Sequence, residues 1–186
     1  MAVKAQSVIF DQASRPFALY LHWPFCRAKC PYCDFNSHVS NDVDIKIFGD
    51  ALCAEMTHMA SLMPSRPPLS SLFFGGGTPS LMPPILVERL IRHAQDSFGF
   101  TDDIEITAEA NPTSVEAEAM LGFQKAGVNR VSMGVQSLDD AGLKFLGREH
   151  SAAGALQALD KVNKAFDRVS IDLIYALPDQ SPKAWQ

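Results

Sequence analysis

The sequence predicts an α/β protein whose parallel strands form part of a TIM-type (β/α) barrel. Strand-like and helical segments alternate along the chain, which is typical of a parallel sheet with helices in its connections. The strand-like segments are apolar on one face only, whereas a parallel sheet covered on both faces has strands that are apolar nearly throughout. We therefore expect a partial barrel of five βα units with a polar, ligand-filled interior, not an open, doubly wound sheet.

Five segments have the composition of strands and are bounded by turn residues. In the third segment, isoleucine and alanine fall on one face while glutamate and threonine fall on the other. The first, fourth and fifth segments alternate in the same way, and a half-exposed edge strand would explain one such strand but not four. The predicted strands cover residues 17–23, 70–74, 103–109, 129–136 and 167–175.

Helical patterns separate these strands. The first places apolar residues at steps of three and four, and the second follows a pair of prolines at 83–84. The third opens with Thr113 and Glu116, the spacing of a capping box, and stops at Gly127, a typical glycine after a helix. The predicted helices cover about 45–59, 84–94, 113–127 and 151–166.

A fifth helical pattern starts at Ser181 and is cut off at Gln186. An eight-stranded barrel takes about 250 residues, and five strands cannot close one. We therefore expect the chain to be an N-terminal part of a longer protein, without the rest of the barrel and a C-terminal domain. The expected regions are an N-terminal lead-in over 1–16 and a truncated barrel domain over 17–186.

Composition and charge limit the partners. Sixteen basic and 21 acidic residues give a formal net charge of −5, and no basic patch for nucleic acid or an anionic membrane surface is evident. No apolar run reaches the roughly 18–20 residues of a membrane span, and the N-terminus lacks the pattern of a signal peptide. We therefore expect a cytoplasmic protein that binds no nucleic acid and has no transmembrane segment.

The cysteines are the most informative residues. Cys26, Cys30 and Cys33 follow the first strand in a C-x3-C-x2-C pattern, while Cys53 is predicted to be a small buried hydrophobe in the first helix. Active sites gather at the carboxyl edge of a parallel barrel. Three thiolates there could hold three corners of a four-iron cluster and leave one iron open. A zinc site completed by His38 and inert thiols are the alternatives, although zinc normally takes four ligands at regular spacing.

A glycine-rich segment follows the second strand, where Gly75, Gly76 and Gly77 precede Thr78 and Pro79. Without side chains, three glycines let a ligand approach the backbone and leave N–H and C=O groups free to bind it. Glycine turns after strands are common. This one, however, is predicted at the same edge of the sheet as the cysteine loop, which favours a shared site.

The cysteine loop and the glycine segment resemble those of the radical S-adenosylmethionine (SAM) enzymes. Further segments resemble the oxygen-independent coproporphyrinogen III oxidase group of that family, and the resemblance extends from Tyr20 to Pro178. It implies a partial TIM-type barrel of the radical SAM type. The segments that carry it are Tyr-Leu-His-Trp-Pro-Phe-Cys at 20–26, Glu-Ala-Asn-Pro at 109–112, Arg-Val-Ser-Met-Gly-Val-Gln at 130–136 and Ile-Asp-Leu-Ile-Tyr at 171–175.

The resemblance also implies cofactors and their ligands. Cys26, Cys30 and Cys33 would bind a [4Fe-4S] cluster, whose open iron takes the amino and carboxylate groups of SAM. The reduced cluster would then break a C–S bond of SAM and release a deoxyadenosyl radical. The residues implied to bind SAM are Tyr20, Tyr32, Gly76, Gly77, Thr78, Glu109, Gln136, Arg148 and Asp172, and none is assigned as catalytic.

Within this group, the resemblance leaves two main functions. The oxidase decarboxylates two propionates of coproporphyrinogen III, whereas its relatives include haem chaperones that bind haem and pass it to respiratory proteins. This chain has Phe35 where the oxidase carries a further cysteine, and it lacks the oxidase's long extension before the first strand. These departures favour the chaperone subgroup over the oxidase, and a structural metal-binding module without SAM chemistry is a third alternative.

A haem chaperone implies several partners. These are haem or porphyrin as bound cargo, an unidentified haem-accepting protein and an electron donor for the cluster. Transient contact with a membrane protein is compatible with this set. The sequence does not identify the haem ligand.

Overall fold

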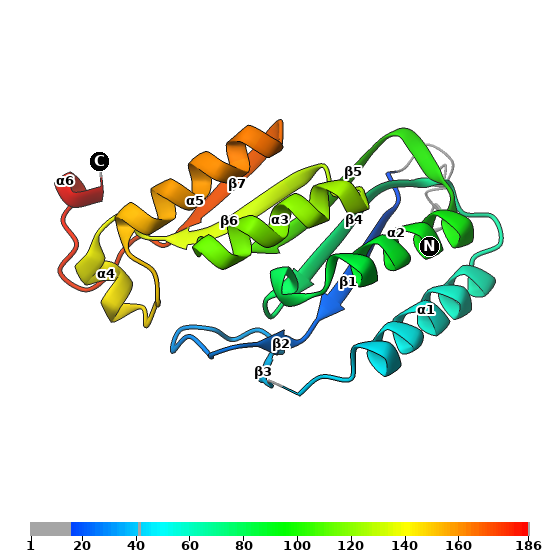
Figure 1. The fold of residues 1–186 in the computed structure, drawn as a ribbon, viewed down its shortest axis with the longest axis horizontal. Coiled ribbons are helices and arrows are strands. Elements are labelled where there is room, and N and C mark those ends of the chain that lie inside the picture. Colours follow the sequence, from blue (N-terminus) through cyan, green and yellow to red (C-terminus); the bar gives the residue numbers. More distant parts are fainter. Residues whose placement is uncertain (1–15, 41, 186) are drawn as a thin grey trace, which may run out of the picture.

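The computed structural model describes residues 16–40 and 42–185. Its main sheet has five parallel strands in the order β1-β4-β5-β6-β7 (Figure 1). The strands are β1 (Ala18–Trp23), β4 (Leu69–Gly76), β5 (Phe100–Ala110), β6 (Arg130–Gln136) and β7 (Arg168–Leu173). The helices are α1 (Ile45–Leu62), η2 (Pro79–Leu81), α2 (Pro84–Phe98), α3 (Ser114–Ala126), α4 (Asp140–Phe145), α5 (Ala152–Ala165) and α6 (Pro182–Trp185).

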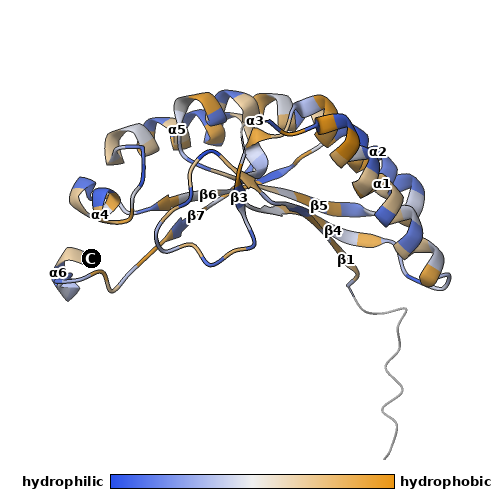
Figure 2. Cartoon of the chain, turned by 90° about the horizontal axis from the view of Figure 1, so that it is seen from below, coloured by the Kyte–Doolittle hydropathy of each residue, from blue (hydrophilic) through white to orange (hydrophobic). Residues whose placement is uncertain are grey.

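Helices α1, α2, α3 and α5 cover one face of the sheet, and neighbours in this series pack against one another. Figure 2 shows them as an arc over the curved sheet, whose opposite, concave face none of the four covers. Within the described part of the chain, β1 and β7 are the two edges of the sheet. The predicted α/β fold with a partial parallel barrel is confirmed.

The hydrophobic core lies between the helices and the outer face of the sheet. Leu72 and Phe74 of β4 are fully buried there, as are Leu90 of α2 and Phe123 of α3. Cys53 of α1 is buried in the same core, as the sequence predicts, and burial raises the pKa of its thiol. The apolar faces of the strands therefore meet the helices.

The inner face of the sheet carries a polar network. The Arg130 guanidinium of β6 donates to Thr107 Oγ1 of β5 at 3.2 Å and to Ser170 Oγ of β7 at 3.0 Å. One layer nearer the carboxyl ends, Ser132 Oγ donates to an Asp172 carboxylate oxygen at 3.2 Å. The predicted polar interior is thus present, and its side chains bond across neighbouring strands.

The third helix begins and ends where the sequence predicts, but its capping box is only half formed. The Thr113 hydroxyl accepts the Glu116 backbone N–H at 3.2 Å, and Gly127 ends the helix with a φ of 111°. The Glu116 carboxylate does not return to Thr113. It accepts the backbone N–H of Asn111 at 2.8 Å instead.

Some short elements are absent from the sequence-based assignment. A two-stranded parallel sheet of β2 (Phe25–Cys26) and β3 (His38–Val39) closes the cysteine loop, and α4 follows β6. These elements are too short to show a hydrophobic period. The lead-in predicted over 1–16 lies outside the described residues except for its last residue. Among the residues that the structure describes, no helix is both long and apolar enough to cross a membrane.

We expect Leu90→Ala to lower the free energy of unfolding by about 2–5 kcal/mol, because it opens a cavity in the core. Ile85→Ala in the same helix is the control: Ile85 is 72% exposed, and the change should stay within about 0.5 kcal/mol. Urea unfolding of both variants measures the difference. Equal losses would contradict this assignment of the core.

Candidate metal and cofactor site

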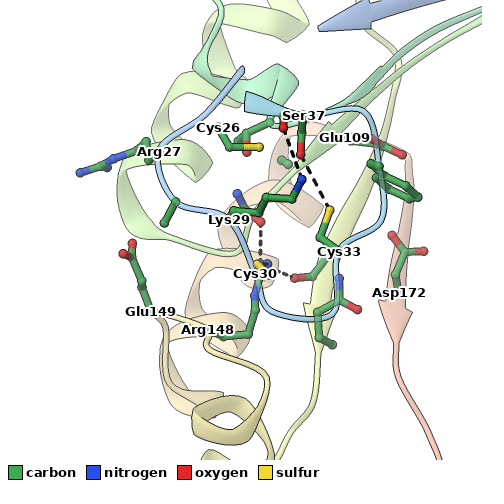
Figure 3. Close-up of a pocket in the computed structure, with 18 of the residues that line it drawn as sticks. Cys26, Arg27, Lys29, Cys30, Cys33, Ser37, Glu109, Arg148, Glu149 and Asp172 are labelled. Carbon is green, nitrogen blue, oxygen red and sulfur yellow. Dashed lines mark hydrogen bonds between the residues drawn. The ribbon is translucent and has the colours of Figure 1, made fainter. Parts of the chain in front are cut away.

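A cavity of about 580 Å³ opens at the carboxyl ends of the strands. All five strands point their carboxyl ends at it, so the loops that follow them meet there. Figure 3 shows Cys26, Cys30 and Cys33 on one loop, with Glu109 and Asp172 from two other strands facing them. Arg148 lies beside Cys30.

The cysteine loop is held at both ends and in its middle. The β2–β3 pairing joins Cys26 to Val39, and the backbone N–H of His38 donates to the Pro24 carbonyl at 2.7 Å. Inside the loop, the Cys33 N–H donates to the Cys30 carbonyl at 3.0 Å. Because these contacts fix the backbone, the three thiols are presented to the cavity together.

The described residues form no site for a single metal ion. No three histidine, cysteine, aspartate or glutamate side chains within residues 16–40 and 42–185 are placed to hold a single metal ion. A tetrahedral zinc would bring its sulfur ligands to about 3.8 Å from one another, whereas the cysteines of a four-iron cluster bind different irons and lie farther apart. His38 is exposed and does not line the cavity. Three thiolates without a fourth ligand from His38 fit a cluster with one open iron better than the alternative zinc site.

The glycines have a packing role that the sequence did not predict. A Cβ at Gly75 would lie 2.8 Å from the Tyr20 ring, and one at Gly76, where φ is 118°, would lie 2.7 Å from the His22 ring. A Cβ at Gly77 would come within 2.9 Å of Cys26 Sγ. The three glycines thus allow β1 and the cysteine loop to pack closely on β4.

The prediction that the backbone N–H groups of this segment are free is wrong. The N–H of Gly76 donates to a Glu109 carboxylate oxygen at 3.1 Å, and that of Gly77 to the Trp23 carbonyl at 2.7 Å. The Thr78 N–H donates to the Phe25 carbonyl at 2.9 Å. These donors are used to close the site and are not directed at a ligand.

Glu109 is the second-last residue of β5 and lies on the cavity wall. Burial raises the pKa of its carboxyl, the Gly76 N–H opposes this, and the nearby Asp172 carboxylate adds to the rise. Two carboxylates on one wall favour a ligand that carries positive charge. Gln136, which also lines the cavity, has a φ of 70°, and a left-handed backbone at a residue other than glycine is frequent at functional sites.

Arg148 connects the cysteine loop to the rest of the cavity. Its Nη1 donates to Cys30 Sγ at 3.3 Å and to the Tyr32 hydroxyl at 3.4 Å. Burial raises the pKa of Tyr32 to about 12, despite the opposing charge of Arg148. Among the described residues, Arg148 Nε is buried and has no hydrogen-bond partner. A buried cationic donor of this kind suits an anionic group in the cavity.

Of the twelve predicted site residues, eleven line this one cavity and Tyr20 does not. The Tyr20 ring stacks on Phe73, with ring centroids 5.8 Å apart, on the inner face of the sheet. The sequence analysis assigned neither Glu116 nor Asn111 to the site, although both line the cavity. Asn111 directly follows a strand, and this position could have indicated a residue of the site. Glu116 has the spacing of a capping box with Thr113, which suggested a role in the helix and not in the cavity.

Comparison with known proteins places these observations in a family. The model of the Radical SAM superfamily matches residues 20–186. The chain is 43% identical over 173 residues to the mitochondrial radical S-adenosyl methionine domain-containing protein 1 of Bos taurus, covering 92% of this chain and 39% of that protein. It is 40% identical to the heme chaperone HemW of Haemophilus influenzae, covering 89% and 45%.

A solved structure also aligns with this fold. The coproporphyrinogen III oxidase HemN of Escherichia coli superposes with a TM-score of 0.80 and 34% identity, covering 92% of this chain and 40% of that one. The chain therefore spans 39% to 45% of the length of these three relatives.

We expect Glu109→Gln to stabilise the cluster-free protein at neutral pH. With the native pKa raised, the folded chain binds a proton more tightly than the unfolded chain, so the free energy of unfolding falls as pH rises from about 4.5 toward the native pKa. The amide removes this decline and still accepts the Gly76 N–H.

Urea unfolding across pH tests this expectation, with Glu118→Gln on the exposed face of α3 as control. The gap between Glu109→Gln and wild type should grow above pH 4.5 and close below it. A variant less stable than wild type at pH 7 would contradict it.

Proposed function

Because the chain belongs to the radical SAM superfamily, we propose that it is part of a protein that binds a [4Fe-4S] cluster, SAM and haem and passes the haem to acceptor proteins. Family membership implies the cluster and SAM. The observation that carries the proposal is the meeting of three cysteines, two carboxylates and Arg148 in one cavity. We extend it to haem because relatives of similar sequence carry the name heme chaperone HemW.

In this proposal, Cys26, Cys30 and Cys33 each bind one iron, and the fourth iron stays open for SAM. When bound, the cluster supplies the electron that breaks a C–S bond of SAM. The chain's own contribution is to hold the three thiolates on a closed loop at the cavity. The Arg148 N–H directed at Cys30 Sγ stabilises negative charge on that thiolate.

The charges of the cavity match those of SAM. Glu109 and Asp172 suit its ammonium and sulfonium groups, while the positive charge of the Arg148 guanidinium suits its carboxylate. Tyr32, whose hydroxyl is held by Arg148, offers a ring for the adenine, and Gln136, Gly76, Gly77 and Thr78 complete the lining. Tyr20 lies on the inner face of the sheet but does not line the cavity. We propose that it approaches SAM from outside the cavity.

Phe35 supports the chaperone over the oxidase. It lines the cavity on the cysteine loop and is 58% exposed, at the position where the oxidase carries a further cysteine. An exposed aromatic ring is suited to contact with a planar, apolar macrocycle. The alternative, oxidation of coproporphyrinogen III, is supported by the similarity of the fold to HemN.

The proposal implies two kinds of partner. An electron donor must reduce the cluster, and a haem-accepting protein must receive the cargo. The cytoplasmic location stays a prediction. Three relatives are named as mitochondrial proteins, which is a different compartment. The division into a lead-in over 1–16 and a core from 17 is likewise proposed, and it is supported by a family match that begins at residue 20.

The test uses the full-length parent protein, reconstituted anaerobically with iron and sulfide. It is incubated with reductant, SAM and coproporphyrinogen III, and the porphyrins are separated by chromatography. The same preparation is titrated with haem. The HemN oxidase of Escherichia coli serves as positive control.

We expect haem to bind and protoporphyrinogen to stay at background, because Phe35 replaces the oxidase cysteine. Many turnovers to protoporphyrinogen without haem binding would instead make the protein the oxidase.

A further inference from the structure

Glu116 is a buried carboxylate that the proposed function does not use. It lies in the first turn of α3, is 4% exposed and lines the cavity. We propose that Glu116 is a positioning residue that orients Arg148 toward the cysteine loop through Asn111. The inference rests on the proposed cluster and SAM site.

The contacts of Glu116 are all with donors. One carboxylate oxygen accepts the Asn111 backbone N–H at 2.8 Å and the Ser80 hydroxyl, and the other accepts the Asn111 side-chain amide at 3.4 Å. Ser80 belongs to η2, which follows the glycine segment, and Asn111 follows β5. One buried side chain therefore ties together two of the loops that form the cavity.

These contacts determine which way the Asn111 amide points. An ionised carboxylate only accepts hydrogen bonds, and a guanidinium only donates them. Asn111 lies between the two, with its NH₂ toward Glu116 and its Oδ1 accepting Arg148 Nη2 at 2.5 Å. Turning the amide over would leave both contacts unmade. By holding the Asn111 NH₂, Glu116 thus keeps the Oδ1 of Asn111 directed at Arg148.

Arg148 carries this orientation to the cysteine loop. The Nη2 that donates to Asn111 Oδ1 also donates to the Gly134 carbonyl at 3.0 Å, which fixes the plane of the guanidinium. In that plane, Nη1 reaches Cys30 Sγ and the Tyr32 hydroxyl. If the Asn111 contact is lost, the guanidinium loses its alignment with Cys30 and with the cavity in which SAM is proposed to bind.

Helix capping does not account for this carboxylate. The Thr113 hydroxyl already accepts the Glu116 backbone N–H and caps α3. The Glu116 side chain reaches out of the helix to residues of two other loops. A purely structural role predicts a loss of stability, whereas a positioning role predicts a change at Cys30 and at bound SAM.

The test is an exchange of acid and amide in the full-length, reconstituted protein. The single variants Glu116→Gln and Asn111→Asp each leave like groups facing each other. The double variant Glu116→Gln/Asn111→Asp reverses the polarity, so that position 116 donates, and position 111 accepts from both neighbours. Glu118→Gln, on the exposed face of the same helix, is the matched control.

Iron and sulfide content and thermal unfolding first establish that each variant folds and carries its cluster. We expect Glu116→Gln to weaken SAM binding by about tenfold, the effect of one lost charge-assisted hydrogen bond. Asn111→Asp still offers an oxygen to Arg148 and should therefore lose less. The cluster should also become harder to reduce, because hydrogen bonds to cluster sulfurs help to set its potential. The double variant should recover most of both losses, and Glu118→Gln should match wild type.

The outcomes separate this inference from the proposed function. A Glu116→Gln variant that matches Glu118→Gln, or a double variant in which the losses add, would overturn the positioning role. A single variant that fails to fold leaves the double variant as the deciding one, since only restored polarity predicts its recovery. Wild-type protein that binds neither cluster nor SAM would overturn the proposed function itself.

Discussion

The shared direction of the five strands is the constraint on which the site depends. Parallel strands end at the same edge of a sheet, so residues far apart in sequence meet there. Arg148 reaches Cys30 across 118 positions of the chain, and the Gly76 N–H reaches Glu109 across 33. The outer faces of the strands are buried under helices, which leaves the inner faces free to be polar.

Close packing of the first two neighbouring strands is the second requirement. Tyr20 and His22 of β1 lie over Gly75 and Gly76 of β4, and no larger residue would leave room for their rings. This approach brings the cysteine loop down onto Gly77. The glycines of this segment therefore help to place the thiols, and Gly76, Gly77, Thr78 and Pro79 line the cavity while Gly75 does not.

The sequence predicted the fold because its signals are local. Alternation of polar and apolar residues is visible along each strand, and Gly127 marks the end of α3 wherever the helix packs. The packing role of the glycines could not be predicted in this way. It depends on the distance between β1 and β4, which neither strand's sequence determines by itself. Glu116 was misread for a similar reason. The capping-box spacing is satisfied within four residues, whereas its partner Ser80 lies 36 positions away.

Two chemistries meet in the cavity, and they correspond to the two proposed ligands. Carboxylates and a guanidinium line the part formed by β5, β7 and Arg148, which suits a small zwitterion with a sulfonium. Phe35 on the cysteine loop, Leu173 at the end of β7 and Ile174 after it add apolar side chains to the same cavity. A haem-binding radical SAM protein needs both surfaces near one cluster.

The most direct test of this account is electron paramagnetic resonance of the reduced, reconstituted parent protein with and without SAM. Three cysteine ligands leave one iron open, so SAM should bind that iron and shift the signal of the reduced [4Fe-4S] cluster. Cys30→Ser should abolish the signal, whereas Cys53→Ser, in the buried core, should retain it. A cluster signal that saturating SAM leaves unchanged would contradict the account.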